Sequence, residues 1–162
     1  MRGARSLVAA IVLGLIVAGC GGPAAAEEIR SSAARAGADP GALEGARAAL
    51  DALSVDLYKA LAGDGRNLVL SPYSVATALA MTRAGAVGET ASQMDTVLHA
   101  ALAKDIHSGL NALDLALAKR PGTYPMGDKT VELELATANR LWAQKDFAFE
   151  AAFLDQLARS YG

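Results

Sequence analysis

The sequence has a single cysteine, Cys20, in 162 residues. One thiol cannot form a disulfide or a CxxC-type zinc site within the chain, so packing must hold the fold together and no metal or other cofactor is expected. Positive charge is not in excess: 15 Lys and Arg stand against 17 Asp and Glu, giving a formal net charge of -2. The chain therefore lacks the basic footprint of a nucleic-acid-binding protein, and no nucleic-acid partner is expected. A hydrophobic content of 52% is sufficient for a core.

A long hydrophobic span is also missing from the N-terminal region. The apolar run over residues 7–17, which follows two arginines, is short of the roughly 20 residues that a transmembrane helix needs. This pattern predicts a signal peptide over residues 1–20. Its end, Val17-Ala18-Gly19-Cys20, resembles the lipobox of bacterial lipoproteins, in which small residues precede a lipidated cysteine. The resemblance implies lipid attachment at Cys20 and a membrane-anchored lipoprotein at the cell surface, exposed to the extracellular space.

The segment after this cysteine has little that could contribute to a core. Residues 21–38 are mostly Gly, Ala and Ser with scattered charge, and Ile29 is their one large apolar residue. We interpret them as a flexible tether. A folded region, residues 39–162, begins with Asp39 as an N-cap and Pro40 at the first helical position.

Periodicity predicts the elements of this folded region, in which no internal repeat appears. Four helices are expected before a loop over residues 120–129, where Pro and Gly cluster, and one helix is expected after it. The second begins with Ser71 as N-cap, the third follows a capping box at residues 90–93, and the last begins after Asp146. Their apolar faces lie over residues 43–61, 75–80, 94–98, 102–117 and 149–161. Two strands are expected, a short buried one at residues 67–70 and a longer one at 131–142 that runs from half-exposed to buried.

Two blocks of the chain resemble the serpin family. Residues 67–98, NLVLSPYSVATALAMTRAGAVGETASQMDTVL, resemble the serpin segment with the SPxS turn and the G-x-T-x-x-Q-M helix. Residues 133–162, LELATANRLWAQKDFAFEAAFLDQLARSYG, resemble the stretch around A-N-R-L-[FW], F-x-x-x-F and a terminal tyrosine. With matching helical segments at 43–61 and 102–117, the resemblance covers the chain from Leu43 onward.

The resemblance implies an α+β fold, the N-terminal part only of a serpin, with helices, one strand of the central sheet and one short buried strand. It implies a serine protease inhibitor rather than an enzyme. In serpins a reactive-centre loop is cleaved and inserts as a strand into the central sheet, which traps the protease. That loop lies near the end of the family's domain, so the domain is expected to be truncated before it and this chain to be inactive alone.

Partners and alternatives follow from the same resemblance. The full-length protein would bind a target protease, of the serine class or alternatively the cysteine class, and would contact the membrane through its lipid anchor. Two other interpretations stay open. One is a non-inhibitory serpin that acts as a surface binding or chaperone module, and the other is a truncated, inactive relic. The hinge residues that would separate them are not among these residues.

The resemblance also points to structural residues, while no residue is assigned a catalytic role. Ser71, Pro72 and Ser74 match the SPxS segment, which implies a polar shutter beneath the opening of the central sheet. A local interpretation is a helix cap, and both can hold. Asn67 and Asn139 stand on otherwise apolar strands, where each amide is expected to tie its strand to a neighbour.

A hydrolase triad of Ser71 with a histidine, His99 or His107, is disfavoured. The segment lacks G-x-S-x-G, and the serine precedes a proline at a helix start.

Overall fold

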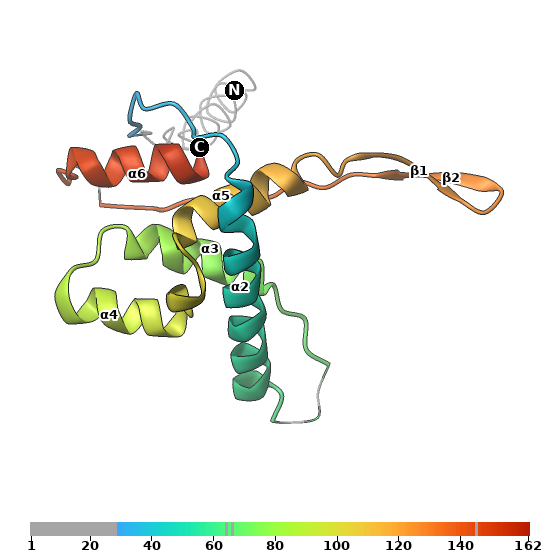
Figure 1. The fold of residues 1–162 in the computed structure, drawn as a ribbon, viewed down its shortest axis with the longest axis horizontal. Helices are drawn as coiled ribbons and strands as arrows, with labels where there is room; N and C mark the ends of the chain where they lie inside the picture. Colours follow the sequence, from blue (N-terminus) through green and yellow to red (C-terminus); the bar gives the residue numbers. More distant parts are fainter. Residues whose placement is uncertain (1–28, 64, 66, 145) are drawn as a thin grey trace, which may run out of the picture.

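The computed structural model describes residues 29–63, 65, 67–144 and 146–162 (Figure 1). These residues form a cluster of helices from which one β-hairpin projects, so the α+β class is confirmed. The elements are α2 (Pro40–Leu61), α3 (Pro72–Arg83), α4 (Gly88–Val97), the 3-10 turn η1 (Ala100–Leu102), α5 (Ile106–Leu117), β1 (Gly122–Met126), β2 (Lys129–Leu133) and α6 (Ala151–Tyr161). Within the described residues, no helix is both long and apolar enough to cross a bilayer.

The start of α2 confirms the predicted cap. The Asp39 carboxylate accepts a hydrogen bond of 2.8 Å from the Gly41 N–H, and Pro40 takes the first helical position. The predicted apolar face over residues 43–61 is partly confirmed, because Ala46 and Leu53 are buried and Leu50 and Leu57 pack against the core. Its end is wrong, since Leu61 is 53% exposed.

α2 and α5 cross at a point where only small residues fit (Figure 1). A Cβ placed on Gly109 of α5 would lie 2.3 Å from the Ala46 Cβ and 2.8 Å from the Ala42 carbonyl oxygen of α2. Larger side chains complete the core around this crossing, among them Leu53, Leu98 and Leu110. The contact of α2 with α5 therefore forms the centre of the molecule.

Two helix starts differ from the prediction. α4 begins at Gly88, ahead of the predicted capping box, and Val87 at its N-cap position makes no side-chain hydrogen bond. Within α4 the Gln93 amide donates to Glu89 instead, so the capping box is wrong. The fourth predicted helix is interrupted near its start, since residues 100–102 form η1 and α5 begins only at Ile106, where the Asp105 carboxylate caps it.

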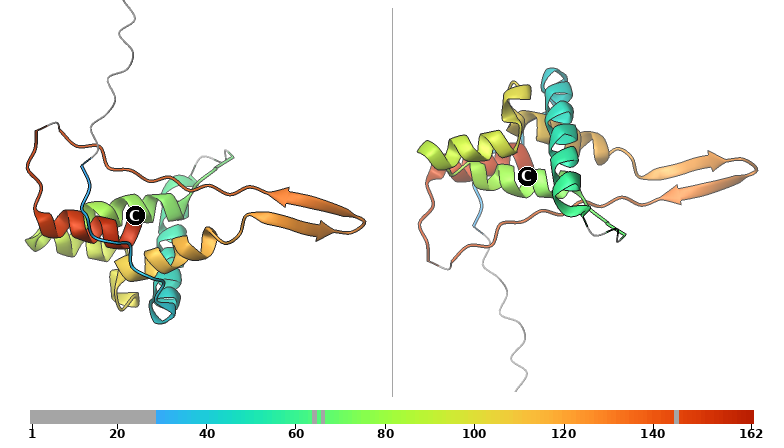
Figure 2. Two further views of the ribbon diagram at one scale, coloured as in Figure 1. Left: turned by 90° about the horizontal axis from the view of Figure 1, so that it is seen from above. Right: turned by 90° about the horizontal axis from the view of Figure 1, so that it is seen from below.

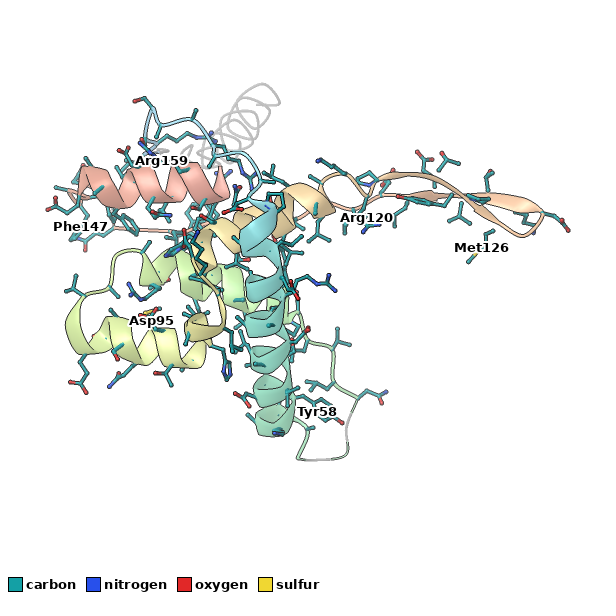
Figure 3. The ribbon with its side chains drawn as sticks, viewed as in Figure 1. Tyr58, Asp95, Arg120, Met126, Phe147 and Arg159 are labelled. Atoms are coloured by element: carbon teal, nitrogen blue, oxygen red, sulfur yellow. The ribbon has the colours of Figure 1, made fainter. Side chains whose placement is uncertain are left out.

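The segment predicted as a loop after α5 is a β-hairpin. β1 and β2 pair antiparallel from Gly122↔Leu133 to Met126↔Lys129, and every residue of both strands is exposed. The hairpin extends away from the helices, with Met126 near its tip (Figure 3). The loop prediction was therefore wrong between residues 122 and 129.

The two predicted strands are not formed as expected. Residues 67–70 have no regular secondary structure, and Val69 is 98% exposed. The predicted strand at 131–142 stops at Leu133, and the residues after it are irregular and largely exposed, with Trp142 at 77%. A strand needs a partner for its N–H and C=O groups. Residues 131–133 find one in β1, but no described segment pairs with residues 67–70 or with those after Leu133.

α6 begins later than predicted, at Ala151 rather than just after Asp146. Phe149 lies outside the helix and stacks on Phe153 with ring centroids 5.8 Å apart. Phe153 also packs against the turn that follows α3, because a Cβ placed on Gly85 would lie 3.2 Å from its ring. The predicted face of the helix is therefore partly confirmed, over Phe153, Leu157 and Tyr161, which are half-buried.

The described part of the predicted tether is bonded to the helices. We call residues 29–38 the strap; it runs in an irregular path beside α6 before α2 begins (Figure 2). The Ala36 N–H donates to the carbonyl oxygen of Arg159 on α6, at 2.9 Å. This part of the chain is therefore attached to the folded body rather than free of it.

Candidate functional site

The three residues of the SPxS turn lie together at the start of α3. The Ser71 Oγ accepts a hydrogen bond from the Ser74 N–H at 3.3 Å and donates one to the Ser74 Oγ at 2.9 Å. Pro72 occupies the first helical position, where the absence of an N–H is harmless. The local role as a helix cap is confirmed, while the shutter role stays a prediction.

The two asparagines do not join this turn. Asn67 is exposed in the irregular segment ahead of α3, and Asn139 is half-buried in the segment after β2. Neither lies in a strand of the described residues, and the expectation that each ties a strand to its neighbour stays a prediction. The predicted lipid-attachment residue, Cys20, lies outside the described residues.

A polar junction that the sequence analysis missed lies just behind α3's first turn. The carboxylate of Asp114 on α5 accepts hydrogen bonds from the Arg35 Nη2 (2.7 Å), the Tyr73 hydroxyl (2.7 Å) and the Thr137 Oγ1 (3.0 Å). The strap, α3, α5 and the segment after β2 therefore meet at one partly buried carboxylate. We call this the Asp114 junction.

The electrostatics of the junction favour an ionised Asp114. Burial by itself would raise the pKa of this carboxyl, but the hydrogen bonds from its three partners and the charge of Arg35 outweigh burial and lower the pKa. Burial, followed by the hydrogen bond to Asp114, raises the pKa of the Tyr73 hydroxyl, which therefore stays a donor at neutral pH. The junction is thus an anion held by one cation and two neutral donors.

A second polar cluster lies where α6 packs on the start of α5. The His107 Nδ1 is 2.7 Å from the Tyr161 hydroxyl, and the two rings meet edge to face. Burial lowers the pKa of His107 and raises that of Tyr161. This histidine is therefore neutral at neutral pH and serves as a packed hydrogen-bonding group.

The hydrogen bonds do not assemble the disfavoured hydrolase triad. The Nε2 of His99 lies 2.8 Å from the Asp56 carboxylate, His107 pairs with Tyr161, and Ser71 pairs with Ser74. The structure places no histidine in hydrogen-bond contact with Ser71.

A shallow cavity of about 430 Å³ lies beside the His107 cluster, lined by residues of α3, α4, η1 and α5. Arg83 in its wall is paired through two 2.7 Å contacts with Asp95, which Figure 3 labels on α4. Asp105 also lines the wall, so the cationic side chains of this cavity stand beside acidic ones. Among the described residues, no group of three or more His, Cys, Asp and Glu could hold a metal ion.

Comparison with known proteins decides the family. The family model described as serpin (serine protease inhibitor) matches residues 48–162. This chain belongs to the serpin family. The assignment confirms the expected α+β serpin portion, apart from the two strands corrected above. Serpins are protease inhibitors and not catalytic enzymes, which agrees at the family level with the absence of an assigned catalytic residue.

Several curated serpins resemble this one over most of its length. It is 34% identical to the leukocyte elastase inhibitor of Sus scrofa over 122 residues, which is 74% of this chain and 30% of that protein. It is 35% identical to an uncharacterized serpin-like protein of Thermococcus kodakarensis over 114 residues, 70% and 25% of the two chains. It is 37% identical to Iris of Ixodes ricinus over 112 residues, 67% and 27%. The serpin chain described here thus spans no more than 30% of these relatives.

The sequence carried a partial signal for the Asp114 junction. Asn111 and Asp114 are polar residues beside the apolar row of α5, and Tyr73 lies within the SPxS turn. Arg35 carried no signal, because it lies in a segment with the composition of a tether and ahead of the residues that match the family.

Proposed function

We propose that this chain forms the N-terminal helical part of a serpin that inhibits a serine protease by insertion of a cleaved loop, with cysteine proteases as the alternative target class. The observation that carries the proposal is the serpin match over residues 48–162. The name of the Sus scrofa relative supports an elastase-type target for that protein and, by similarity, a serine protease here. The proposal places the reactive-centre loop in residues outside this chain, and the match of this chain to only 30% of that relative supports it.

The geometry at the start of α3 supports a shutter role for Ser71 and Ser74. Their side chains are hydrogen-bonded to each other, and the Asp114 junction holds the intervening Tyr73 from behind. Because the first turn of α3 is held in this way, it could support the strands of a central sheet while they separate and close again. We assign to Pro72 the role of fixing the backbone of this turn.

Inhibition is tested on gene products of two lengths. The nucleotide sequence beyond the codon of Gly162 is read, and both the 162-residue chain and any longer product are incubated with a panel of serine proteases that includes an elastase. We expect an SDS-stable complex with the longer product alone. A complex with the 162-residue chain would contradict its inactivity. A stop codon directly after Gly162 would favour the relic, and a longer product that binds without forming a complex would favour the non-inhibitory module.

We also propose that the mature protein is a lipoprotein held at the cell surface through Cys20, where it faces extracellular proteases. The lipobox at the end of the predicted signal peptide supports this. Labelling of a bacterial expression host with a palmitate analogue tests it, with Gly22→Ala as the matched control. Loss of label in Cys20→Ala but not in Gly22→Ala is expected. Equal labelling of the wild type and Cys20→Ala would overturn the anchor and leave the inhibitor proposal intact.

A further inference from the structure

The strap contacts two helices through different groups. Its backbone is bonded to α6 through Ala36, and the hydroxyl of Ser31 donates to the carboxylate of Asp155 on the same helix. Its Arg35 side chain reaches α5 instead, where Nε donates to the Asn111 Oδ1 at 2.9 Å and Nη2 to Asp114. The strap therefore bridges α6 and α5, although it precedes the residues that match the serpin family.

Asn111 shows that α5 is built to receive this segment. The residue is 2% exposed, and its amide nitrogen donates to the carbonyl oxygens of Ala36 (3.0 Å) and Gly37 (3.2 Å) while its oxygen accepts from Arg35. These hydrogen bonds all go to the strap. A buried amide that loses its partners is destabilising. The buried face of α5 therefore depends on the strap, although the composition of the strap is that of a flexible tether.

Arg35 connects the strap to the start of α3. The carboxylate that accepts from Arg35 also accepts from Tyr73, the second residue of α3, and from Thr137 in the segment after β2. If Arg35 leaves, a partly buried carboxylate loses its cation. Water that takes the place of Arg35 then competes with Tyr73 and Thr137 for the carboxylate oxygens, which weakens both contacts.

We propose that the strap is a conformational lock: when Arg35 is seated on Asn111 and Asp114, it holds the first turn of α3 and the Thr137 segment in place. Detachment of the strap frees both. Residues 71–74 are the predicted shutter, so the lock would set how readily that shutter moves; this last consequence rests on the proposed function.

The lock is tested by hydrogen exchange on the full chain purified in detergent. Arg35→Ala is compared with Arg47→Ala, which removes an exposed arginine from the neighbouring helix α2. We expect Arg35→Ala to speed exchange of the amides from Val75 to Leu79 by about tenfold or more, and Arg47→Ala to leave them unchanged. Arg35→Lys keeps the charge but cannot reach Asn111 and Asp114 with a planar fork, so an intermediate rate is expected.

Two results would overturn the lock. One is faster exchange confined to the strap and α6 in Arg35→Ala, with α3 unchanged, which would reduce the strap to a clamp between α5 and α6. The other is an Arg35→Lys chain that is folded and exchanges faster than the wild type in the strap but not in α3, which applies even if Arg35→Ala fails to fold. Neither result depends on protease inhibition, so the proposed function would stand in both cases.

Discussion

At the scale of single residues, His107 is placed to make the fold sensitive to acid. Its ring is largely buried between α5 and α6, and desolvation of the charged form lowers its pKa below the ordinary value of about 6.5. Nearby charges partly oppose each other, since Asp105 and Asp95 favour the imidazolium and Arg83 disfavours it. The neutral ring is the form that packs against Tyr161.

Stability is therefore expected to fall as the medium is acidified below about pH 6.5. Between the lowered pKa of the folded chain and the ordinary value, the unfolded chain binds a proton at His107 and the folded chain does not. This difference in proton binding favours unfolding. Urea unfolding midpoints between pH 7.5 and 5.5 measure the effect. His107→Gln should flatten the dependence, whereas His99→Gln, the control, should retain it. Equal slopes for the wild type and His107→Gln would contradict this role.

The Ser71 cap gives a second prediction at this scale. Ser71→Ala removes the acceptor for the Ser74 N–H and is expected to destabilise the fold by about 1 kcal/mol. Ser71→Asn supplies a side-chain oxygen of similar capping ability and should retain most of the stability. Thermal unfolding followed by circular dichroism compares the three proteins. A Ser71→Ala chain as stable as the wild type would show that the cap contributes nothing.

At the scale of elements, the crossing of α2 and α5 depends on a missing side chain. Gly109→Ala would improve intrinsic helix propensity, yet its Cβ would collide with Ala46 and with the backbone at Ala42. We expect a net loss of about 1–3 kcal/mol, the usual cost of overpacking. Gly63→Ala is the control, because a Cβ there meets nothing within 4 Å. Chemical denaturation measures both, and a stabilised Gly109→Ala would refute the close approach.

A local chemical signal made the starts of two helices predictable, although the Asp105 cap at the start of α5 was not recognised. Asp39 with Pro40, and Ser71 with Pro72, place the beginnings of α2 and α3 correctly because a cap acts on N–H groups within the same turn. The starts of α4 and α6 were missed because Val87 and the residue before Ala151 make no side-chain cap hydrogen bond.

Strands were predicted poorly because their stability depends on a partner. The run at 67–70 and the residues after Leu133 have patterns typical of strands, but no described segment pairs with either. The hairpin was missed although its two strands pair with each other, because its turn was not recognised. Gly127 has a φ of 62° and, with Asp128, makes the two-residue turn typical of a hairpin, whereas Pro125 and Gly127 had been interpreted only as loop residues.

The Asp114 junction shows the limit of a single sequence. Arg35, Tyr73 and Thr137 lie 79, 41 and 23 residues from Asp114 in the chain. Periodicity assigns residues to the face of one element, but it does not say which faces meet. The pairing therefore required the fold.

At the scale of the whole molecule, a considerable apolar surface is uncovered. Val69, Met126, Trp142 and Phe147 are all more than half exposed, and Figure 3 shows Met126 and Phe147 at opposite ends of the molecule. Because these side chains are dispersed rather than gathered in one contiguous patch, they do not by themselves mark an interaction site.

The one tryptophan reports on this surface directly. Because Trp142 is mostly exposed, its emission should resemble that of tryptophan in water and change little on unfolding in urea. Acrylamide quenching should be similar in the folded and unfolded chain. Trp142→Phe, which should abolish the signal, checks that no tyrosine emission is mistaken for it. A blue-shifted emission that moves to the red on unfolding would show that Trp142 is buried.

Because the strap is bonded to the helices, only the residues between Cys20 and Ile29 would separate the serpin body from a membrane. Ile29 follows Cys20 by nine residues, and nine residues span at most about 30 Å even when fully extended. With Cys20 lipidated as proposed, Ile29 at the start of the strap would lie within that distance of the lipid headgroups. If the full-length protein inhibits a protease as proposed, that protease would have to approach close to the cell surface to meet it.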